Sequence, residues 1–463
     1  MGDFSLLENF IIEKMRKTRI PGLSVAVVDR DEVVYARGFG LRDLSSGSRA
    51  TPRTIYGIGS VTKSFTALAV LKLVEEGKLS LEDKVEDHIG VRLRPFGEPV
   101  KIHHLLTHSS GIPALAYAEA FIRGVLGLDS QWLPLSSPAD IVAFMRESNE
   151  WAVAKPGHRF FYLNEGYVLL GSIVEKASGL KYEDYVRREI LEPLGMKRTY
   201  FNKEEVGQDP DVATPYIVDR EGRHHESRFP YGVTSDGGLL SNTLDLARYA
   251  GMFIGRGRLG ETVVAEPETI ESMEKGYIDT HFKLFGDEKY GYGLIVTNRF
   301  LGRKLVHHSG SVLVYTAFFG YLPSDGWAVI VLANSAGYPL SSIGMYALAL
   351  ALGYEPEKHL DFIRAERLLE KLEGIYQAYK GTHTYCIKRV GDFLSVIYKD
   401  KYTGSTTVLA PVELKEDYAK FYTRANGRVY EAEFFIKDDK VTMLYERYKM
   451  VKTSDIISPL HEC

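Results

Sequence analysis

Strand patterns lie at both ends of the larger part of this chain, and the region between them is helical. Near the N-terminus, Leu23 to Val28 and Val33 to Gly38 are apolar runs separated by a charged turn, which predicts a hairpin. Farther along, Tyr315 to Leu322 and Trp327 to Ala333 flank a Pro-Ser-Asp-Gly turn, which predicts another. The economical fold is an α+β class, with one antiparallel sheet built from both ends and helices packed on it.

Helical patterns fill the region between these strands. The segment from Ser60 to Leu71 is apolar around most of its circumference and continues without glycine or proline to Gly77, which predicts a buried helix ending near that glycine. Other helices are expected within Met1 to Ile20, where apolar residues recur at helical spacing, and near residues 138–147, 165–178, 182–190, 243–255 and 341–352.

The composition of the chain changes towards its C-terminus. Residues 356–373 are charged and helical, which predicts a linker. Beyond it, short alternating segments such as Phe393 to Tyr398 are separated by turn sequences such as Asn426-Gly427 and Asp438-Asp439. This pattern predicts a second, all-β domain that forms a small barrel or sandwich. The expected division is a first domain over 1–355, the linker 356–373 and the β domain 374–463.

Charge and apolar content exclude two kinds of partner. The 57 basic and 61 acidic residues give a formal net charge of −4 without a basic stripe, so no nucleic acid and no acidic membrane surface is expected as partner. No apolar run approaches the ~20 residues that span a bilayer, and the N-terminal helix is too charged for a signal peptide.

Cys386 and Cys463 are expected to be unpaired thiols. Together these features predict a cytoplasmic protein.

Ser60 and Lys63 are the first candidates for catalysis. A serine hydroxyl is a poor nucleophile at neutral pH unless a base within hydrogen-bond reach takes its proton. On a helix, a lysine three residues later lies on the same face, and burial favours the neutral form that can act as that base. The same spacing occurs at Ser178 and Lys181, where Gly179 indicates a helix end, so the pattern alone does not separate a nucleophile from a structural serine.

Two further short patterns carry chemistry. In Tyr162-Leu163-Asn164, a tyrosine near a lysine cation can lower its own pKa and shuttle a proton; an ordinary core tyrosine is the alternative. In His308-Ser309-Gly310, the histidine can bind substrate or tune the lysine, and the glycine lets a substrate backbone approach closely; a surface-loop histidine is the alternative. Both patterns recur elsewhere, as Tyr200-Phe201-Asn202 and His88-Ile89-Gly90.

A metal centre is the competing prediction. His104 and His108 have the spacing of two zinc ligands on one helix, but Leu105 stands where the catalytic glutamate of that motif follows the first histidine. The adjacent pairs His224-His225 and His307-His308 are poorly placed for joint ligation from one element. No metal and no other cofactor is therefore expected.

The three short patterns together carry a resemblance. In the order Ser60-x-x-Lys63, Tyr162-x-Asn164 and His308-x-Gly310, they resemble the signature elements of the serine β-lactamase and penicillin-binding peptidase family, on its class C-like branch. Residues 6 to 353 are covered, and the C-terminal part resembles the lipocalin-like β-barrel appended to CubicO-type members. Three further segments are similar to landmarks of the family: Ile102 to Pro113, Leu191 to Met196 and Asp236 to Ser241.

The resemblance implies a fold and a set of roles. The fold is a β-lactamase-like antiparallel sheet flanked by helices with an all-helical lobe, and residues 1–355 are the catalytic domain. Ser60 attacks a carbonyl and forms an acyl-enzyme, while Lys63 and Tyr162 relay its proton. Asn164 binds the substrate amide or orients Lys63. The remaining implied roles are an oxyanion hole from the backbone amides of Ser60 and Ser311, and a substrate site lined by His308 and Gly310.

The histidine at position 308 departs from the lysine of the usual third element. It weakens the recognition of a substrate carboxylate, so β-lactam hydrolysis and carboxypeptidase activity rank behind hydrolysis of peptides with D-residues, the first choice, and of esters, the second. A non-catalytic binding protein on this fold is the alternative of a different class. The expected partners are a small peptide or ester substrate and other copies of the chain, since a tyrosine-rich β domain can form a homo-oligomer. The same domain could instead dock near the site and limit substrate size.

Overall fold

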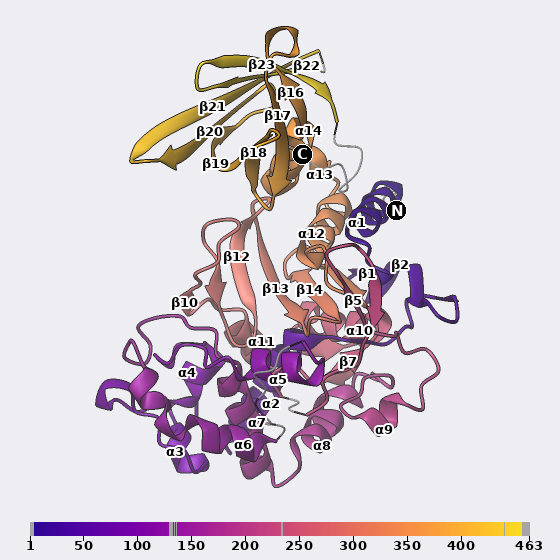
Figure 1. Ribbon diagram of the computed structural model, residues 1–463. Helices are drawn as coiled ribbons and strands as arrows, with labels where there is room; N and C mark the ends of the chain where they lie inside the picture. The colour runs from indigo at the N-terminus through magenta and orange to yellow at the C-terminus, as the bar shows by residue number, and fades with distance from the viewer. Residues whose placement is uncertain are drawn as a thin grey trace. The chain divides into compact units, whose positions relative to one another are not determined.

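The computed structural model describes residues 4–128, 133, 135, 137–232, 235–438 and 440–455. Its backbone divides into two compact units, Met1–Tyr354 and Glu355–Cys463 (Figure 1). The first unit combines a sheet with helices, and the second is a barrel preceded by two helices.

A nine-stranded antiparallel sheet forms the centre of the first unit, in the strand order β10-β11-β12-β13-β14-β15-β1-β2-β3. Strands from the two ends of the unit meet where β1 pairs with β15, from Leu23 opposite Ala333 to Asp29 opposite Trp327. The α+β fold with one sheet built from both ends is confirmed. The strands are β1 (Gly22–Asp29), β2 (Glu32–Asp43), β3 (Ser48–Arg49), β10 (Ile278–Asp279), β11 (Lys289–Tyr290), β12 (Ile295–Phe300), β13 (Arg303–Ser311), β14 (Thr316–Leu322) and β15 (Trp327–Ala333).

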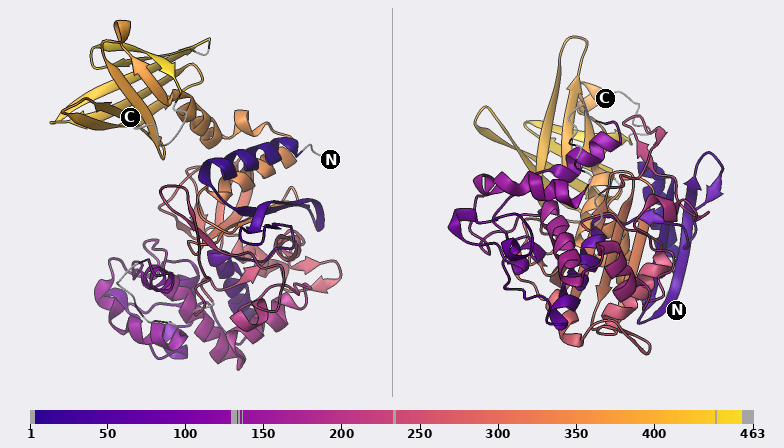
Figure 2. Two further views of the ribbon diagram at one scale, coloured as in Figure 1. Left: turned by 45° about the vertical axis from the view of Figure 1, so that its right-hand side comes forward. Right: turned by 90° about the horizontal axis from the view of Figure 1, so that it is seen from below.

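Helices cover both faces of this sheet. On one face, α12 (Leu340–Ala351) contacts β14 and β15 and packs against α1 (Ser5–Thr18), as Figure 2 shows. On the other face, α10 (Thr243–Ile254) contacts β1, β14 and β15. The helices expected at the N-terminus and near 243–255 and 341–352 are therefore present, and each buries an apolar side against the sheet or a neighbouring helix.

Alternation along the strands decides which side chains face which helix. Phe318 of β14 lies against α12, while its neighbour Phe319 lies near Tyr249 of α10. In β13, His308 is directly opposite Phe319, and residues opposite each other share a face. His308 therefore faces the side of α10, and His307 faces the side of Phe318.

A helical lobe surrounds α2 (Thr62–Glu75), against which α7 (Asn164–Ser178) packs. Every residue of α2 from Thr62 to Leu71 is buried, as its apolar circumference predicts. Ser60 lies in a 3-10 turn, Gly59–Val61, directly before α2. The other α-helices described in the first unit are α3 (Val85–His88), α4 (Ile102–Leu106), α5 (Tyr117–Val125), α6 (Pro138–Phe144), α8 (Tyr182–Val186), α9 (Lys203–Val206) and α11 (Pro267–Met273).

The second unit contains a closed barrel of eight strands, which confirms the all-β domain expected there. Leu369 and Leu372 of α14 (Asp361–Leu372) are buried in one cluster with inward-facing barrel residues such as Phe421 and Phe434, so part of the segment expected to be a linker adds to the barrel core. The strands are β16 (Gly374–Gln377), β17 (Thr384–Val390), β18 (Phe393–Lys399), β19 (Gly404–Leu414), β20 (Tyr418–Ala425), β21 (Arg428–Lys437), β22 (Lys440–Tyr445) and β23 (Tyr448–Ser454), and α13 (Pro356–His359) precedes α14.

Cys386 of β17 forms a disulfide bond, so the expectation of an unpaired thiol at this position is wrong. The second cysteine, Cys463, lies outside the described residues, as does Asp439 of an expected turn. The argument from free thiols to a reducing compartment is thereby removed, and the cytoplasmic location stays a prediction. In the described part of the chain, no helix is long and apolar enough to cross a membrane.

Candidate active site

Ser60 is held at the start of α2 by a short strand pair and a glycine. The strand β4 (Tyr56–Gly57) pairs with β7 (Leu240–Ser241), and the next amide, that of Ile58, donates to the Leu239 carbonyl. Gly59 then takes a φ of 50°, in the left-handed region that favours glycine. A Cβ at this position would lie 2.6 Å from the backbone nitrogen of Ser311, so only glycine lets the turn approach β13 this closely.

The strand β13 approaches the same turn because residue 310 also lacks a side chain. A Cβ on Gly310 would lie 1.9 Å from the carbonyl oxygen of Ile58 and 3.1 Å from the nitrogen of Ser60. Gly310 thus accommodates the protein's own backbone, whereas a substrate backbone was expected to approach there. The approach brings the backbone nitrogens of Ser60 and Ser311 to one junction.

Lys63 connects the serine to two other parts of the site. Its buried Nζ donates to Ser60 Oγ at 3.1 Å, to Asn164 Oδ1 at 2.8 Å and to the carbonyl oxygen of Asp236 at 2.7 Å. The carbonyl and amide oxygens can only accept, whereas a hydroxyl can donate or accept. When Lys63 loses a proton, its two remaining N–H bonds stay with Asn164 and Asp236. Its lone pair then points to the Ser60 hydroxyl.

Burial makes that neutral form accessible. It lowers the pKa of Lys63 to about 8, although the nearby carboxylates of Asp236, Glu165 and Glu119 act to raise it. Glu165 and Asp236 are both buried, and burial raises the pKa of each, for Glu165 to about 7. Tyr117 links the two carboxyls, since its hydroxyl donates to Asp236 Oδ2 at 2.6 Å and its backbone amide to Glu165 Oε1 at 3.1 Å.

Tyr162 lies beside the lysine with its ring rather than its hydroxyl. Lys63 Nζ is 5.0 Å from the centroid of the Tyr162 ring. Burial raises the pKa of Tyr162, and the neighbouring Ser60 hydroxyl lowers it only in part. The expected lowering by the lysine is therefore wrong, and Tyr162 is a neutral phenol near pH 7. Its buried hydroxyl has no hydrogen-bond partner of standard geometry among the described residues.

His308 is buried and both its ring nitrogens are engaged by the protein. Nδ1 lies 2.6 Å from the carbonyl oxygen of Ser309, which can only accept, so Nδ1 carries the proton. Nε2 then accepts from the Tyr290 hydroxyl at 3.0 Å. Burial and the charge of Lys63 lower the pKa of His308 to about 3. The histidine is therefore neutral and offers no charge to a substrate carboxylate.

A cavity of about 650 Å³ opens onto Ser60. Its walls carry five of the residues expected from the sequence, namely Ser60, Tyr162, Asn164, His308 and Ser311, while Lys63 and Gly310 lie directly behind them. The other lining residues are Glu119, Phe282, Lys283, Leu284, Phe285, Glu288, Ile295, His307, Ser309, Ser341 and Met345.

Several groups at the site were missed in the sequence. Asp236 and His108 lie in segments that are similar to landmarks of the family, and this similarity could have pointed to them. Glu119 and Tyr290 belong to no pattern that would have identified them. His108 supports Tyr162, because its Nδ1 accepts from the Leu163 amide at 3.0 Å and its ring centroid lies 4.2 Å from that of Tyr162.

Ser178 and the spaced pair His104 and His108 do not line this cavity. Ser178 ends α7 and its hydroxyl bonds locally to Leu180. His104 Nδ1 accepts from the Lys101 amide, while His108 is engaged with Leu163. Among the residues that the structure describes, no group of three or more His, Cys, Asp or Glu could hold a metal ion.

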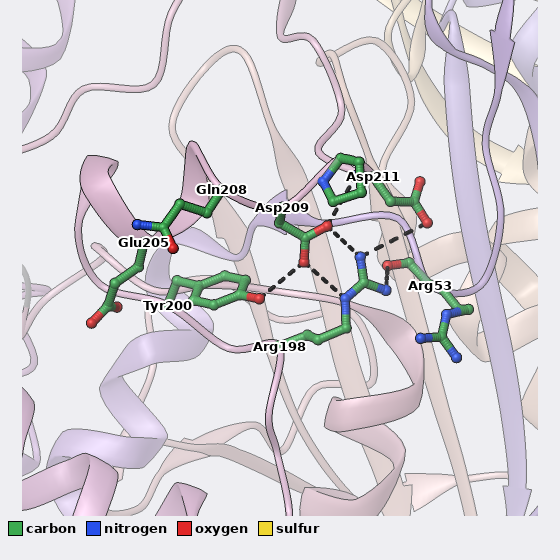
Figure 3. A pocket seen from close by; sticks show the side chains of 8 residues that line it. Arg53, Arg198, Tyr200, Glu205, Gln208, Asp209 and Asp211 are labelled. Carbon is green, nitrogen blue, oxygen red and sulfur yellow. Dashed lines mark hydrogen bonds and ion pairs between the residues drawn. The ribbon is translucent and has the colours of Figure 1, made fainter.

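A second pocket lies elsewhere in the first unit and shares no lining residue with the cavity at Ser60 (Figure 3). In it, Arg198 Nε donates to Asp209 Oδ2 at 2.8 Å and the Tyr200 hydroxyl donates to the same oxygen at 2.9 Å. Another guanidinium nitrogen of Arg198 donates to the carbonyl oxygen of Arg53. The guanidinium of Arg198 and the carboxylate of Asp209 are thus paired with each other, so we interpret these side chains as a structural ion-pair network.

Comparison with known proteins agrees with this geometry. Residues 7–353 match the family described as Beta-lactamase. The chain belongs to this family. Residues 356–451 match a second family, described as the Pab87 octamerisation domain. The octameric penicillin-binding protein homologue from Pyrococcus abyssi is 55% identical, with a TM-score of 0.94 over 97% of this chain and 100% of that one.

More distant relatives cover only part of the chain. Protein flp of Staphylococcus aureus (strain MW2) is 27% identical over 71% of this chain, and the match spans 62% of the relative's length. A D-stereospecific amidohydrolase from Streptomyces sp. is 22% identical with a TM-score of 0.60, over 74% of this chain and 98% of that one. At this identity the likeness concerns the fold alone.

Proposed function

We propose that this chain is a serine hydrolase that works through an acyl-enzyme on Ser60, within a catalytic domain of residues 1–355. The observation that carries the proposal is the hydrogen-bond set of Lys63, whose two other acceptors direct the lone pair of the neutral amine to Ser60 Oγ. A base held this way can take the hydroxyl proton as the oxygen attacks a carbonyl carbon.

The remaining groups have consistent roles in this mechanism. The backbone amides of Ser60 and Ser311 stabilise the oxyanion of the tetrahedral intermediate. Tyr162, a neutral phenol beside Ser60, passes a proton from Lys63 to the leaving group, and the same pair activates the water that hydrolyses the ester. Asn164 orients Lys63 and binds the substrate amide. His308 and Gly310 shape the wall opposite Tyr162.

The proposed substrate class follows from the absence of a positive charge at position 308. The position that holds a cation in many members carries the neutral His308, so a substrate carboxylate gains little there. We therefore infer that peptides with D-residues and a blocked or distant carboxyl are the first substrates, esters the second and β-lactams the third. The apolar side chains of Phe282, Leu284 and Ile295 offer contact area for an uncharged group.

The experiment compares hydrolysis of matched D-alanyl and L-alanyl anilides and a short acyl ester by the wild type and Ser60→Ala. Preference for the D-anilide together with an inactive variant supports a D-amino-acid peptidase. Cleavage of the ester alone moves the assignment to a carboxylesterase. Full activity of Ser60→Ala would refute the mechanism, and absence of turnover on every substrate favours a binding protein on this fold.

We further propose that the barrel assembles the chain into a homo-oligomer. The proposal is supported by the match to an octamerisation domain and by the octameric homologue at 55% identity. Apolar side chains point outwards from the barrel, where water would otherwise meet them. They are Val408, Val412, Val429, Phe435, Leu444 and Val451.

Sedimentation velocity tests this assembly. We expect the wild type to sediment as an oligomer and the double variant Phe435→Glu, Leu444→Glu to dissociate, because it places charge on the outward apolar face. Lys437→Glu, at the end of the same strand as Phe435, is the matched charge control. A monomeric wild type would contradict the proposal.

A further inference from the structure

The charged side chains around the cavity at Ser60 are unequally satisfied. Three of its lining residues other than histidine carry charge, namely Glu119, Lys283 and Glu288. Glu288 is buried, and its two oxygens accept from the backbone amides of Leu284, Phe285 and Gly286. Lys283 lies 3.5 Å from Asp279. The Glu288 carboxylate and the Lys283 ammonium therefore each have a partner within the same segment of the chain.

Glu119 differs from these two residues. It lies in the first turn of α5, is exposed, and forms no hydrogen bond or ion pair with the residues that the structure describes. Its charge reaches the catalytic groups, since it acts on both Lys63 and Tyr162. Among the described residues that line the cavity with Ser60, Glu119 thus presents an unpaired carboxylate.

Lys283 is the one cation among the described lining residues, and it lies 3.5 Å from Asp279. Lys63 is buried behind Ser60 with its donors engaged. Both lining histidines are neutral near pH 7, because burial lowers the pKa of His307 to about 4 and that of His308 to about 3. An incoming positive group would find an unpaired partner at Glu119, whereas an incoming negative group would have to compete with Asp279 for Lys283.

We infer that Glu119 binds the free ammonium group of the substrate, on the residue whose carbonyl Ser60 attacks. This inference rests on the proposed acyl-enzyme function and narrows it to amino-terminal residues. The chain then acts as an aminopeptidase or as a hydrolase of amino-acid esters, and N-acylated substrates are disfavoured.

The test measures kcat/KM for D-alanyl anilide and N-acetyl-D-alanyl anilide with the wild type, Glu119→Gln and Glu119→Asp. The leaving group is the same, so the two substrates differ only at the amino group, which is charged in one and acetylated in the other. We expect Glu119→Gln to lower kcat/KM for the free amine about 10- to 100-fold, the usual range for a hydrogen bond to a charged group. The N-acetyl substrate should change less than about twofold, and Glu119→Asp should recover part of the loss. Glu261→Gln, which removes an exposed charge in the turn between Leu259 and Thr262, is the control.

Two results would overturn the inference. An equal fall for both substrates would mean that Glu119 acts on Lys63 and not on the ammonium. No fall for the free amine would mean that no contact forms. Neither result touches the proposed function, which fails separately if Ser60→Ala retains activity on these anilides.

Discussion

Replacement of Gly310 by alanine probes the close approach of β13 to the turn that carries Ser60. The added Cβ would lie 1.9 Å from the Ile58 carbonyl oxygen, whereas real Cβ atoms stay at least 3.0 Å from such a neighbour. The obstacle is backbone, so β13 and the turn must separate by about 1 Å. In the proposed mechanism this junction holds the oxyanion, and a displacement of that size there costs about 100-fold in rate. Overpacking also costs about 1–3 kcal/mol of stability.

The assay combines kcat for an acyl ester with urea unfolding of the same preparation. We expect Gly310→Ala to lose about 100-fold in kcat while remaining folded at the assay temperature. Gly90→Ala is the matched control, because its φ is ordinary and a Cβ there would meet no atom within 4 Å. If Gly310→Ala kept its kcat within about twofold of the wild type, the placement of the oxyanion hole at this junction would be wrong.

Three further predictions follow from the electrostatics and hydrogen bonds of the site. In the proposed mechanism Ser60 needs the neutral form of Lys63, so kcat/KM should rise with pH through an apparent pKa of about 8 and stand near a tenth of its plateau at pH 7; a profile flat across this range would contradict the proposed role of Lys63. Glu165→Gln removes a carboxylate that raises the pKa of Lys63, so the acidic limb of that profile should move to lower pH; an unmoved limb would exclude the coupling. Tyr290→Phe leaves Nε2 of buried His308 without its donor, which should lower the free energy of unfolding in urea by about 1–3 kcal/mol; an unchanged midpoint would show that the bond is replaced.

The sheet could be predicted because its defining signals are local. Each hairpin shows two apolar runs and a turn within about twenty residues, and the strand pairing of β1 with β15 follows once both hairpins must bury their apolar faces. The strands β10 and β11 escaped prediction because each is two residues long, too short for an alternation to appear.

The candidate site could be predicted only where its residues belong to short patterns. Ser60 and Lys63 lie within one turn, so their contact follows from helix geometry. The contact of Lys63 with the Asp236 carbonyl joins residues 173 positions apart, and no local pattern fixes it. The pKa of Tyr162 was predicted in the wrong direction because burial outweighs the neighbouring lysine, and burial is a property of the folded chain.

The nucleophile itself is the claim to test most directly. The protein is incubated with a slowly hydrolysed acyl ester, quenched in acid and digested, and the acylated peptide is sequenced by mass spectrometry. We predict the acyl mass on Ser60 in the wild type and in Ser178→Ala, the other serine followed by a lysine three residues later, and no acyl peptide in Ser60→Ala. An acyl group on another residue, or unchanged labelling of Ser60→Ala, would contradict the account.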